Sequence, residues 1–345
     1  MNKKKRIIVS VILSFTVLFS GLAVLVNYWS RTPYGRLDPM VALFLKVIIG
    51  DQNSFSNGKS VAESRKFLID TSRFVSGSGP DLPIVKNIDI PGLAGKIPAR
   101  LYAVEGKNLP IIVFYHGGGW VLGNLDSHDP VCRAIAKETK ALVISVDYRL
   151  APEHKFPAAV EDCYAALVYM YEHGKEFGGD PTKIAVAGDS SGGNLSAVIA
   201  QMARDKNGPR IAMQALIYPA VDLSIEQTES YKNFGKGFML TAEDMKAFAS
   251  AYLKNAEDAK NQMASPIYAK NFKNLPRAIV IAAQFDVLRS EGESYARKLK
   301  EAGVTVKYIS YNGMIHGFIN SLRFMPESNA AIREIAAEMN SAFKN

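Results

Sequence analysis

Cysteine is scarce in this chain of 345 residues, which contains only Cys132 and Cys163. Small disulfide-held domains need more cysteines, and zinc ribbons and thioredoxin-like sites need CxxC pairs, which these two do not form. We therefore expect free thiols rather than a disulfide framework. The sequence also lacks an HExxH pattern and any cluster of histidines and carboxylates, so neither a metal nor an organic cofactor is expected.

Excess positive charge is missing from most of the chain. The formal net charge of +8 would by itself suggest nucleic-acid binding. Four of these charges lie at residues 3–6, and residues 7–30 carry none, which leaves a net +4 for all that follows. Because that balance is ordinary for a protein surface, we expect no nucleic-acid partner.

Proline and glycine are not in excess either, with 16 and 26 residues, which excludes collagen-like and low-complexity chains. A hydrophobic fraction of 48% suffices for a large core. Since α/β folds often exceed 250 residues as one domain, the length fits one large domain with additional segments.

A long apolar run is present from Ile7 to Val26. As a helix, its 20 residues would span about 30 Å, the thickness of a bilayer's hydrocarbon core. Tyr28 and Trp29 follow, and these aromatic types are favoured at membrane interfaces. Residues 1–30 are therefore predicted to be a cytosolic tail and a retained transmembrane anchor.

The basic residues before the run place the amino terminus in the cytosol by the positive-inside rule, and the rest of the chain outside it. A cleaved signal peptide is the alternative, and the protein would then be secreted or periplasmic. Residues 21–23 make a poor cleavage site because apolar residues continue past them. A buried core helix would not need the basic start.

Residues 31–345 alternate between apolar runs and helical stretches. Such alternation predicts an α/β fold, with a mostly parallel sheet covered by helices on both faces and ligands bound beyond the carboxyl ends of the strands. The expected strands are residues 111–115, 141–146, 184–187, 215–218, 278–283 and 306–311.

Helix start signals precede this pattern, and a helical insertion interrupts it. Asp38 and Pro39 predict a short apolar helix over residues 40–49, and Ser60 with Glu63 predicts a capped helix towards Phe74. Residues 77–98 are rich in turn formers and predict loops with short strands. Residues 222–265 contain no good strand and predict a helical insertion.

The segment Gly188–Gly192 (GDSSG) fits the pattern G-x-S-x-G and lies between an expected strand and an expected helix. A nucleophilic serine needs such a sharp strand-to-helix turn. Ser190 would then stand at the amino end of a helix, where N–H groups and the helix dipole favour negative charge.

The segment HGGGW, residues 116–120, follows another expected strand. A tetrahedral intermediate needs N–H donors about 3 Å from its oxyanion, and glycines let the backbone come that close. We expect Gly118 and Gly119 to donate together with the N–H of Ser191, with Gly117 as a substitute donor. Trp120 would occupy space in the substrate pocket near the scissile carbonyl.

A serine nucleophile needs a base that is oriented by an acid. His316 follows the last expected strand, and Asp286 directly follows the strand before it. The order Ser190, Asp286, His316 is that of α/β-hydrolase triads. Glu291 or Glu293 could be the acid instead, although each lies in the following expected helix.

These blocks resemble the hormone-sensitive-lipase-like carboxylesterases of the α/β-hydrolase fold. The matching segments are HGGGWVLGNLDSHD, YRLAPEHKFPAAVEDC, GDSSGGN, FDVLRSEG and MIHGF. The resemblance implies the same triad and oxyanion hole, and a cap from residues 35–75 and 222–265 over an acyl pocket. Ser191 replaces the usual alanine and Val287 the usual proline. The amino-terminal anchor is similar to that of the arylacetamide deacetylase branch.

The predicted function is that of a serine carboxylesterase that hydrolyses short- to medium-chain esters of small molecules through an acyl-enzyme. A deacetylase or amidase acting on acetylated sugars or arylacetamides is the alternative. A ligand-binding protein of the same fold would normally lack a triad member, so the complete set argues against it.

Overall fold

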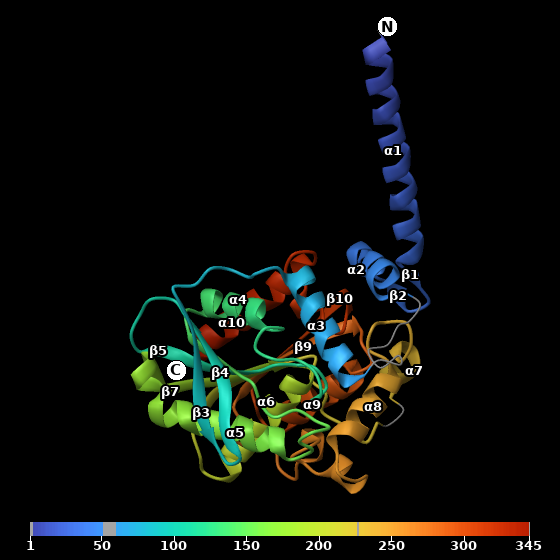
Figure 1. The fold of residues 1–345 in the computed structure, drawn as a ribbon. Coiled ribbons are helices and arrows are strands. Elements are labelled where there is room, and N and C mark those ends of the chain that lie inside the picture. Colours follow the sequence, from blue (N-terminus) through green and yellow to red (C-terminus); the bar gives the residue numbers. More distant parts are fainter. Residues whose placement is uncertain (1–2, 51–59, 226–227, 345) are drawn as a thin grey trace.

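The computed structural model describes residues 3–50, 60–225 and 228–344 (Figure 1). Its main sheet has eight strands in the order β10-β9-β8-β7-β5-β6-β4-β3. They are β3 (Ile84–Gly92), β4 (Gly95–Ala103), β5 (Leu109–Tyr115), β6 (Leu142–Val146), β7 (Gly179–Asp189), β8 (Ile211–Ile217), β9 (Arg277–Phe285) and β10 (Val306–Ile315).

Along the sheet, β6, β5, β7, β8, β9 and β10 are each paired in parallel with the next strand. This confirms the mostly parallel sheet expected from the apolar runs. The region 77–98 differs from its prediction of loops with short strands. There β3 and β4 form a long antiparallel hairpin closed at Gly92 and Gly95, and β4 also pairs antiparallel with β6. Alternating burial at Ile88, Ile90 and Ile97 explains the hairpin, because one face packs on the core and the other meets solvent.

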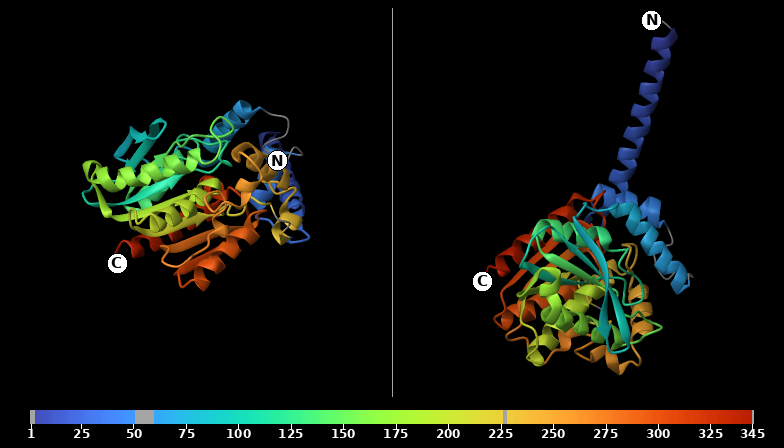
Figure 2. Two further views of the ribbon diagram at one scale, coloured as in Figure 1. Left: turned by 90° about the horizontal axis from the view of Figure 1, so that it is seen from below. Right: turned by 60° about the vertical axis from the view of Figure 1, so that its left-hand side comes forward.

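Helices cover both faces of the sheet (Figure 2). Val113 and Val186 point to the face covered by α5 and α6, and Ile112 and Phe114 point to the face covered by α4 and α10. The bounds are α4 (Asp129–Thr139), α5 (Ala158–His173), α6 (Ser191–Asp205), α9 (Arg289–Glu301) and α10 (Pro326–Ala342).

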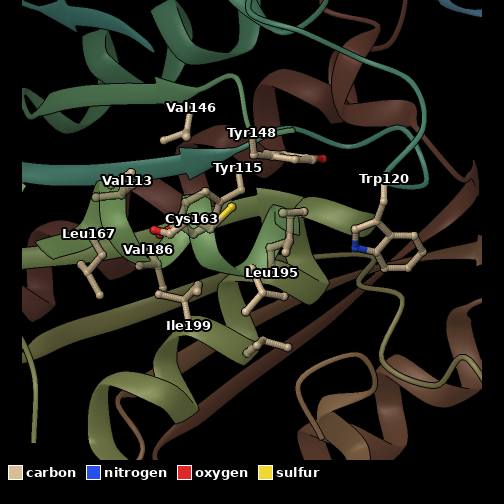
Figure 3. Close-up of a cluster of buried hydrophobic side chains, with 14 of the residues drawn as sticks. Val113, Tyr115, Trp120, Val146, Tyr148, Cys163, Leu167, Val186, Leu195 and Ile199 are labelled. Carbon is tan, nitrogen blue, oxygen red and sulfur yellow. The ribbon is translucent and has the colours of Figure 1, made fainter. Parts of the chain in front are cut away.

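Both cysteines are free thiols inside the core. Cys163 lies among the buried side chains between the sheet and helices α5 and α6 (Figure 3). Cys132 belongs to the cluster on the other face of the sheet.

The apolar run forms α1 (Lys3–Trp29), which projects from the body (Figure 1). Its segment Ser10–Trp29 has a mean hydropathy of 2.0 and is not buried. A small hairpin, β1 (Arg31–Thr32) and β2 (Gly35–Arg36), connects α1 to the next helix.

The expected helix starts are confirmed. Asp38 accepts N–H bonds at the start of α2 (Pro39–Phe44), and Ser60 forms a capping box with Glu63 at the start of α3 (Val61–Ser76). The helix expected over 40–49 continues as the π-helix η1 (Leu45–Ile49). The described part of 222–265 is helical without strands and contains α7 (Glu229–Phe234), α8 (Ala242–Tyr252) and η3 (Glu257–Lys260).

Candidate active site

A strained turn between β7 and α6 holds Ser190. Its φ of 54° and ψ of −118° are rare for a residue with a side chain. The N–H of Ser190 donates to the carbonyl of Ile217 on the neighbouring strand. A Cβ at Gly192 would lie 1.8 Å from the carbonyl oxygen of Tyr115, so glycine is required for α6 to approach β5 this closely.

His316 lies within hydrogen-bond distance of both Ser190 and Asp286. Nε2 of His316 is 2.8 Å from Oγ of Ser190, and Nδ1 is 2.8 Å from Oδ2 of Asp286. The carboxylate is buried and also accepts the N–H of Leu288. A proton on Nδ1, donated to Asp286, leaves the lone pair of Nε2 available for the serine hydroxyl proton.

The two alternative acids lie elsewhere. Glu291 is buried in α9 and accepts N–H bonds from Val221 and Asp222 at the start of the insertion. Burial raises the pKa of its carboxyl well above the ordinary value. Glu293 is exposed. Among the described residues, only Asp286 supplies a carboxylate to the ring nitrogens of His316.

The glycine segment forms a loop directly after β5. Gly118 has a φ of 123°, and a Cβ there would lie 2.3 Å from the carbonyl oxygen of Leu122, so only glycine fits. Within the described residues, the N–H groups of Gly118 and Gly119 have no hydrogen-bond partner in the chain. The N–H of Gly117 donates instead to Oδ1 of Asp189 at 2.9 Å. Ser191 opens α6, where N–H groups lack intrahelical partners.

A buried network that the sequence analysis missed lies behind this loop. Nε2 of His128 is 3.2 Å from Oδ1 of Asp189, and Nδ1 of His128 is 2.9 Å from Oγ of Ser127. Burial by itself would raise the pKa of Asp189, but His128 and the N–H of Gly117 stabilise the carboxylate and the net pKa is lowered. Across the described ranges, no group of three His, Cys, Asp or Glu side chains is placed to hold a metal ion.

Trp120 does not line the cavity at Ser190, which corrects its expected place in the substrate pocket. Its φ of 61° turns the backbone, and the indole is buried with its ring stacked on Tyr252 at 4.6 Å between centroids. Figure 3 shows it among the buried side chains. The aromatic side chain next to the glycine loop is Phe248 of α8, whose ring atoms lie 2.4 Å from where a Cβ on Gly119 would be.

A largely apolar cavity opens at Ser190 and His316. It encloses about 920 Å³ of empty space, a volume that includes its open mouth. Both segments predicted to form a cap contribute to its walls. The apolar lining residues are Phe44, Ile49, Phe67, Leu68 and Val75 from the first segment, Met239, Leu240 and Phe248 from the second, and Leu122, Ile315, Phe318 and Met325 from the rest of the chain.

Comparison with protein families matches residues 112–320 to the α/β-hydrolase fold. The carboxylic ester hydrolase LipN of Mycobacterium tuberculosis is 45% identical over 269 residues, which cover 76% of this chain and 71% of LipN. The carboxylesterase NlhH of the same species is 43% identical over 242 residues, which cover 68% of this chain and 75% of NlhH.

Solved structures of esterases are also similar to this chain. A hyperthermophilic esterase from the archaeon Pyrobaculum calidifontis superimposes with a TM-score of 0.85 at 44% sequence identity. The match covers 88% of this chain and 98% of that esterase. The similarity therefore extends well beyond the central sheet.

Proposed function

The chain belongs to the hormone-sensitive-lipase-like branch of the α/β-hydrolase family and is a carboxylic ester hydrolase, and we propose that Ser190, His316 and Asp286 are its catalytic triad. The observation that carries this assignment is the pair of 2.8 Å contacts from His316 to the other two side chains. All three residues follow the carboxyl ends of β7, β9 and β10.

In the proposed reaction, Nε2 of His316 takes the proton of Ser190 while Oγ attacks the ester carbonyl. Asp286 keeps the imidazole in the required tautomer and stabilises its positive charge. His316 then protonates the leaving alcohol, and water attacks the acyl-enzyme by the same sequence of proton transfers.

The oxyanion is held by the N–H groups of Gly118, Gly119 and Ser191. Two observations support this choice over Gly117. The N–H of Gly117 is already bonded to Asp189, whereas those of the next two glycines have no partner within the described chain. A donor placed before the reaction starts stabilises the transition state without a reorganisation cost.

The substrates are short- to medium-chain esters, and residues 35–75 and 222–265 form a cap over the acyl group. The apolar side chains that both segments place around the cavity support this proposal. Burial of each methylene group would add up to about 0.8 kcal/mol of binding free energy until the chain reaches the end of the cavity.

Residues 1–30 form a cytosolic tail and a retained membrane anchor, as in the arylacetamide deacetylase branch, with the catalytic domain outside the cytosol. Support comes from the unburied segment Ser10–Trp29 and from the basic residues that precede it. Sequencing the amino terminus of the mature membrane-bound protein tests this proposal. A new terminus near Ala23 would identify a signal peptide instead.

The triad is tested by labelling the purified protein with a fluorophosphonate, which should add one phosphonyl group at Ser190 that peptide mass spectrometry locates. Labelling at another serine would overturn the assignment. Hydrolysis of p-nitrophenyl esters and of the matching anilides then separates an esterase from an amidase, and we expect the esters to be cleaved much faster.

A further inference from the structure

We propose that α2 and η1 lie in the membrane–water interface, so that the active-site cavity opens towards the bilayer and takes its substrate from lipid. The substrate class is then an apolar ester dissolved in the membrane rather than a polar ester in solution. This inference rests on the proposed anchor and on the proposed esterase activity.

The first support is the short, well-fixed connection between α1 and α2. Only nine residues separate Trp29 from Pro39. The N–H of Leu37 donates to the carbonyl of Ser30 at 2.8 Å, and the Arg36 guanidinium donates to the side chains of Asn27 and Ser30. Figure 1 shows α2 at the base of α1. If α1 spans the bilayer, its end at Trp29 therefore brings α2 to the depth of the headgroups.

The second support is the apolar outer surface of α2 and η1. Met40, Val47 and Ile48 are 40%, 63% and 39% exposed, although each is a large apolar side chain. Val41 and Leu45 are buried on the other side of the same helix. A helix that is apolar both inwards and outwards is unusual on a water-facing surface and is typical of one that lies partly in lipid.

Positive charges near this surface also favour contact with lipid. Arg31 and Lys46 are exposed within the same short stretch, where their side chains can reach lipid phosphates. Basic residues beside an apolar helix face are the combination found in interfacial helices.

The third support is that the same short helix also lines the cavity at Ser190. Phe44 of α2 and Ile49 of η1 line the cavity that contains Ser190 and His316, while Val47 and Ile48 between them face outwards. The same short helix thus contacts the cavity on one side and would contact lipid on the other. An apolar ester could pass between the two without crossing water, which removes the cost of hydrating its apolar surface.

Depth in the membrane is tested with the full-length chain in vesicles of phosphatidylcholine and phosphatidylglycerol. Cys132 and Cys163 are buried, so a cysteine introduced by Val47→Cys can be labelled selectively with an environment-sensitive fluorophore. We expect a blue-shifted emission that spin-labelled lipid quenches. The matched control is Leu93→Cys, because Leu93 is 82% exposed at the β3–β4 turn. That turn lies at the end of the body away from α1 (Figure 2). A water-like, unquenched signal at position 47 would overturn the proposal.

Substrate delivery is tested with Val47→Glu and Ile48→Glu in the same vesicles. Turnover of p-nitrophenyl laurate dissolved in the lipid should fall by about tenfold or more, whereas turnover of p-nitrophenyl acetate in solution should not change. Leu93→Glu should alter neither rate. An equal loss with both esters, or no loss with either, contradicts delivery from lipid. If the wild type hydrolyses neither ester, the proposed function fails, while the fluorescence result still decides the position of α2.

Discussion

The N–H of Gly117 donates a 2.9 Å hydrogen bond to Oδ1 of Asp189, the residue immediately before Ser190. This bond joins the glycine loop after β5 to the turn that carries the serine. Oδ2 of the same carboxylate faces His128, and Asn320 lies next to it beside the cavity. One buried carboxylate thus connects the loop of the proposed oxyanion donors Gly118 and Gly119 to the turn of the proposed nucleophile Ser190, which lies more than 70 positions later in the sequence.

Asp189→Ala should therefore lower kcat with little change in KM, by about a hundredfold to a thousandfold, the range seen when one oxyanion donor is lost. The kcat of Asp189→Asn should fall between those of Asp189→Ala and the wild type, because an amide oxygen still accepts the N–H of Gly117 but lacks the negative charge of the carboxylate. Steady-state kinetics on a soluble ester measure both. Asp205→Asn, at the end of α6, is the exposed control. A rise in KM alone would show that Asp189 acts on substrate binding instead.

Ser190→Ala should abolish ester hydrolysis and leave the fold intact, because it removes the nucleophile at a turn that can accept alanine. Loss of a triad nucleophile lowers kcat by about a millionfold. Ser191→Ala should retain nearly full activity because it keeps the backbone N–H. The circular dichroism spectra of both variants should match that of the wild type. If Ser191→Ala were the inactive variant, the assignment of the turn would be wrong.

The sequence predicted the strands, and it predicted which side chains would follow their ends, because both depend on local patterns. Apolar runs mark buried strands, and the order of Ser190, Asp286 and His316 follows from where the strands end. The position of Trp120 could not be predicted in this way. Its ring packs on Tyr252, which is distant in sequence, and the left-handed backbone that turns it there has no side-chain signal.

The link between His128 and Asp189 was missed for a similar reason. The two residues are 61 positions apart and meet only because the start of α4 lies beside the end of β7. From the sequence alone, a histidine just before a helix is interpreted as a surface or capping residue. In the structure it is buried, and its Nε2 lies 3.2 Å from Oδ1 of Asp189, the residue before Ser190.

Glu291→Gln should keep activity and improve stability at alkaline pH. Burial raises the pKa of Glu291, so its contribution to stability is fully present below the ordinary value of 4.5 and is lost as pH rises through the folded-state value. Glutamine remains neutral and can still accept the N–H groups of Val221 and Asp222. The wild-type Tm should therefore fall relative to that of Glu291→Gln between pH 5 and pH 9. A constant difference would show that this carboxyl does not titrate differently on folding.

Asp286→Asn is the contrasting variant. It should unfold at nearly the same temperature as the wild type but lower kcat by about ten-thousandfold, because an amide cannot hold the required tautomer of His316. Full activity in this variant, together with a loss in Glu291→Gln, would exchange the roles of the two acids.

The last prediction concerns acyl-chain length. For dissolved p-nitrophenyl esters, kcat/KM should rise and then fall, with its maximum at about four to eight carbons, because each methylene gains transfer energy only until the cavity ends. Phe248→Ala should move the maximum to longer chains, since this ring packs over Gly119 and lines the cavity. Trp120→Phe is the matched control and should leave the maximum in place, because its ring lies in the core. A profile that still rises at about sixteen carbons would mean that the cavity does not limit chain length and that the cap opens fully to bulky esters.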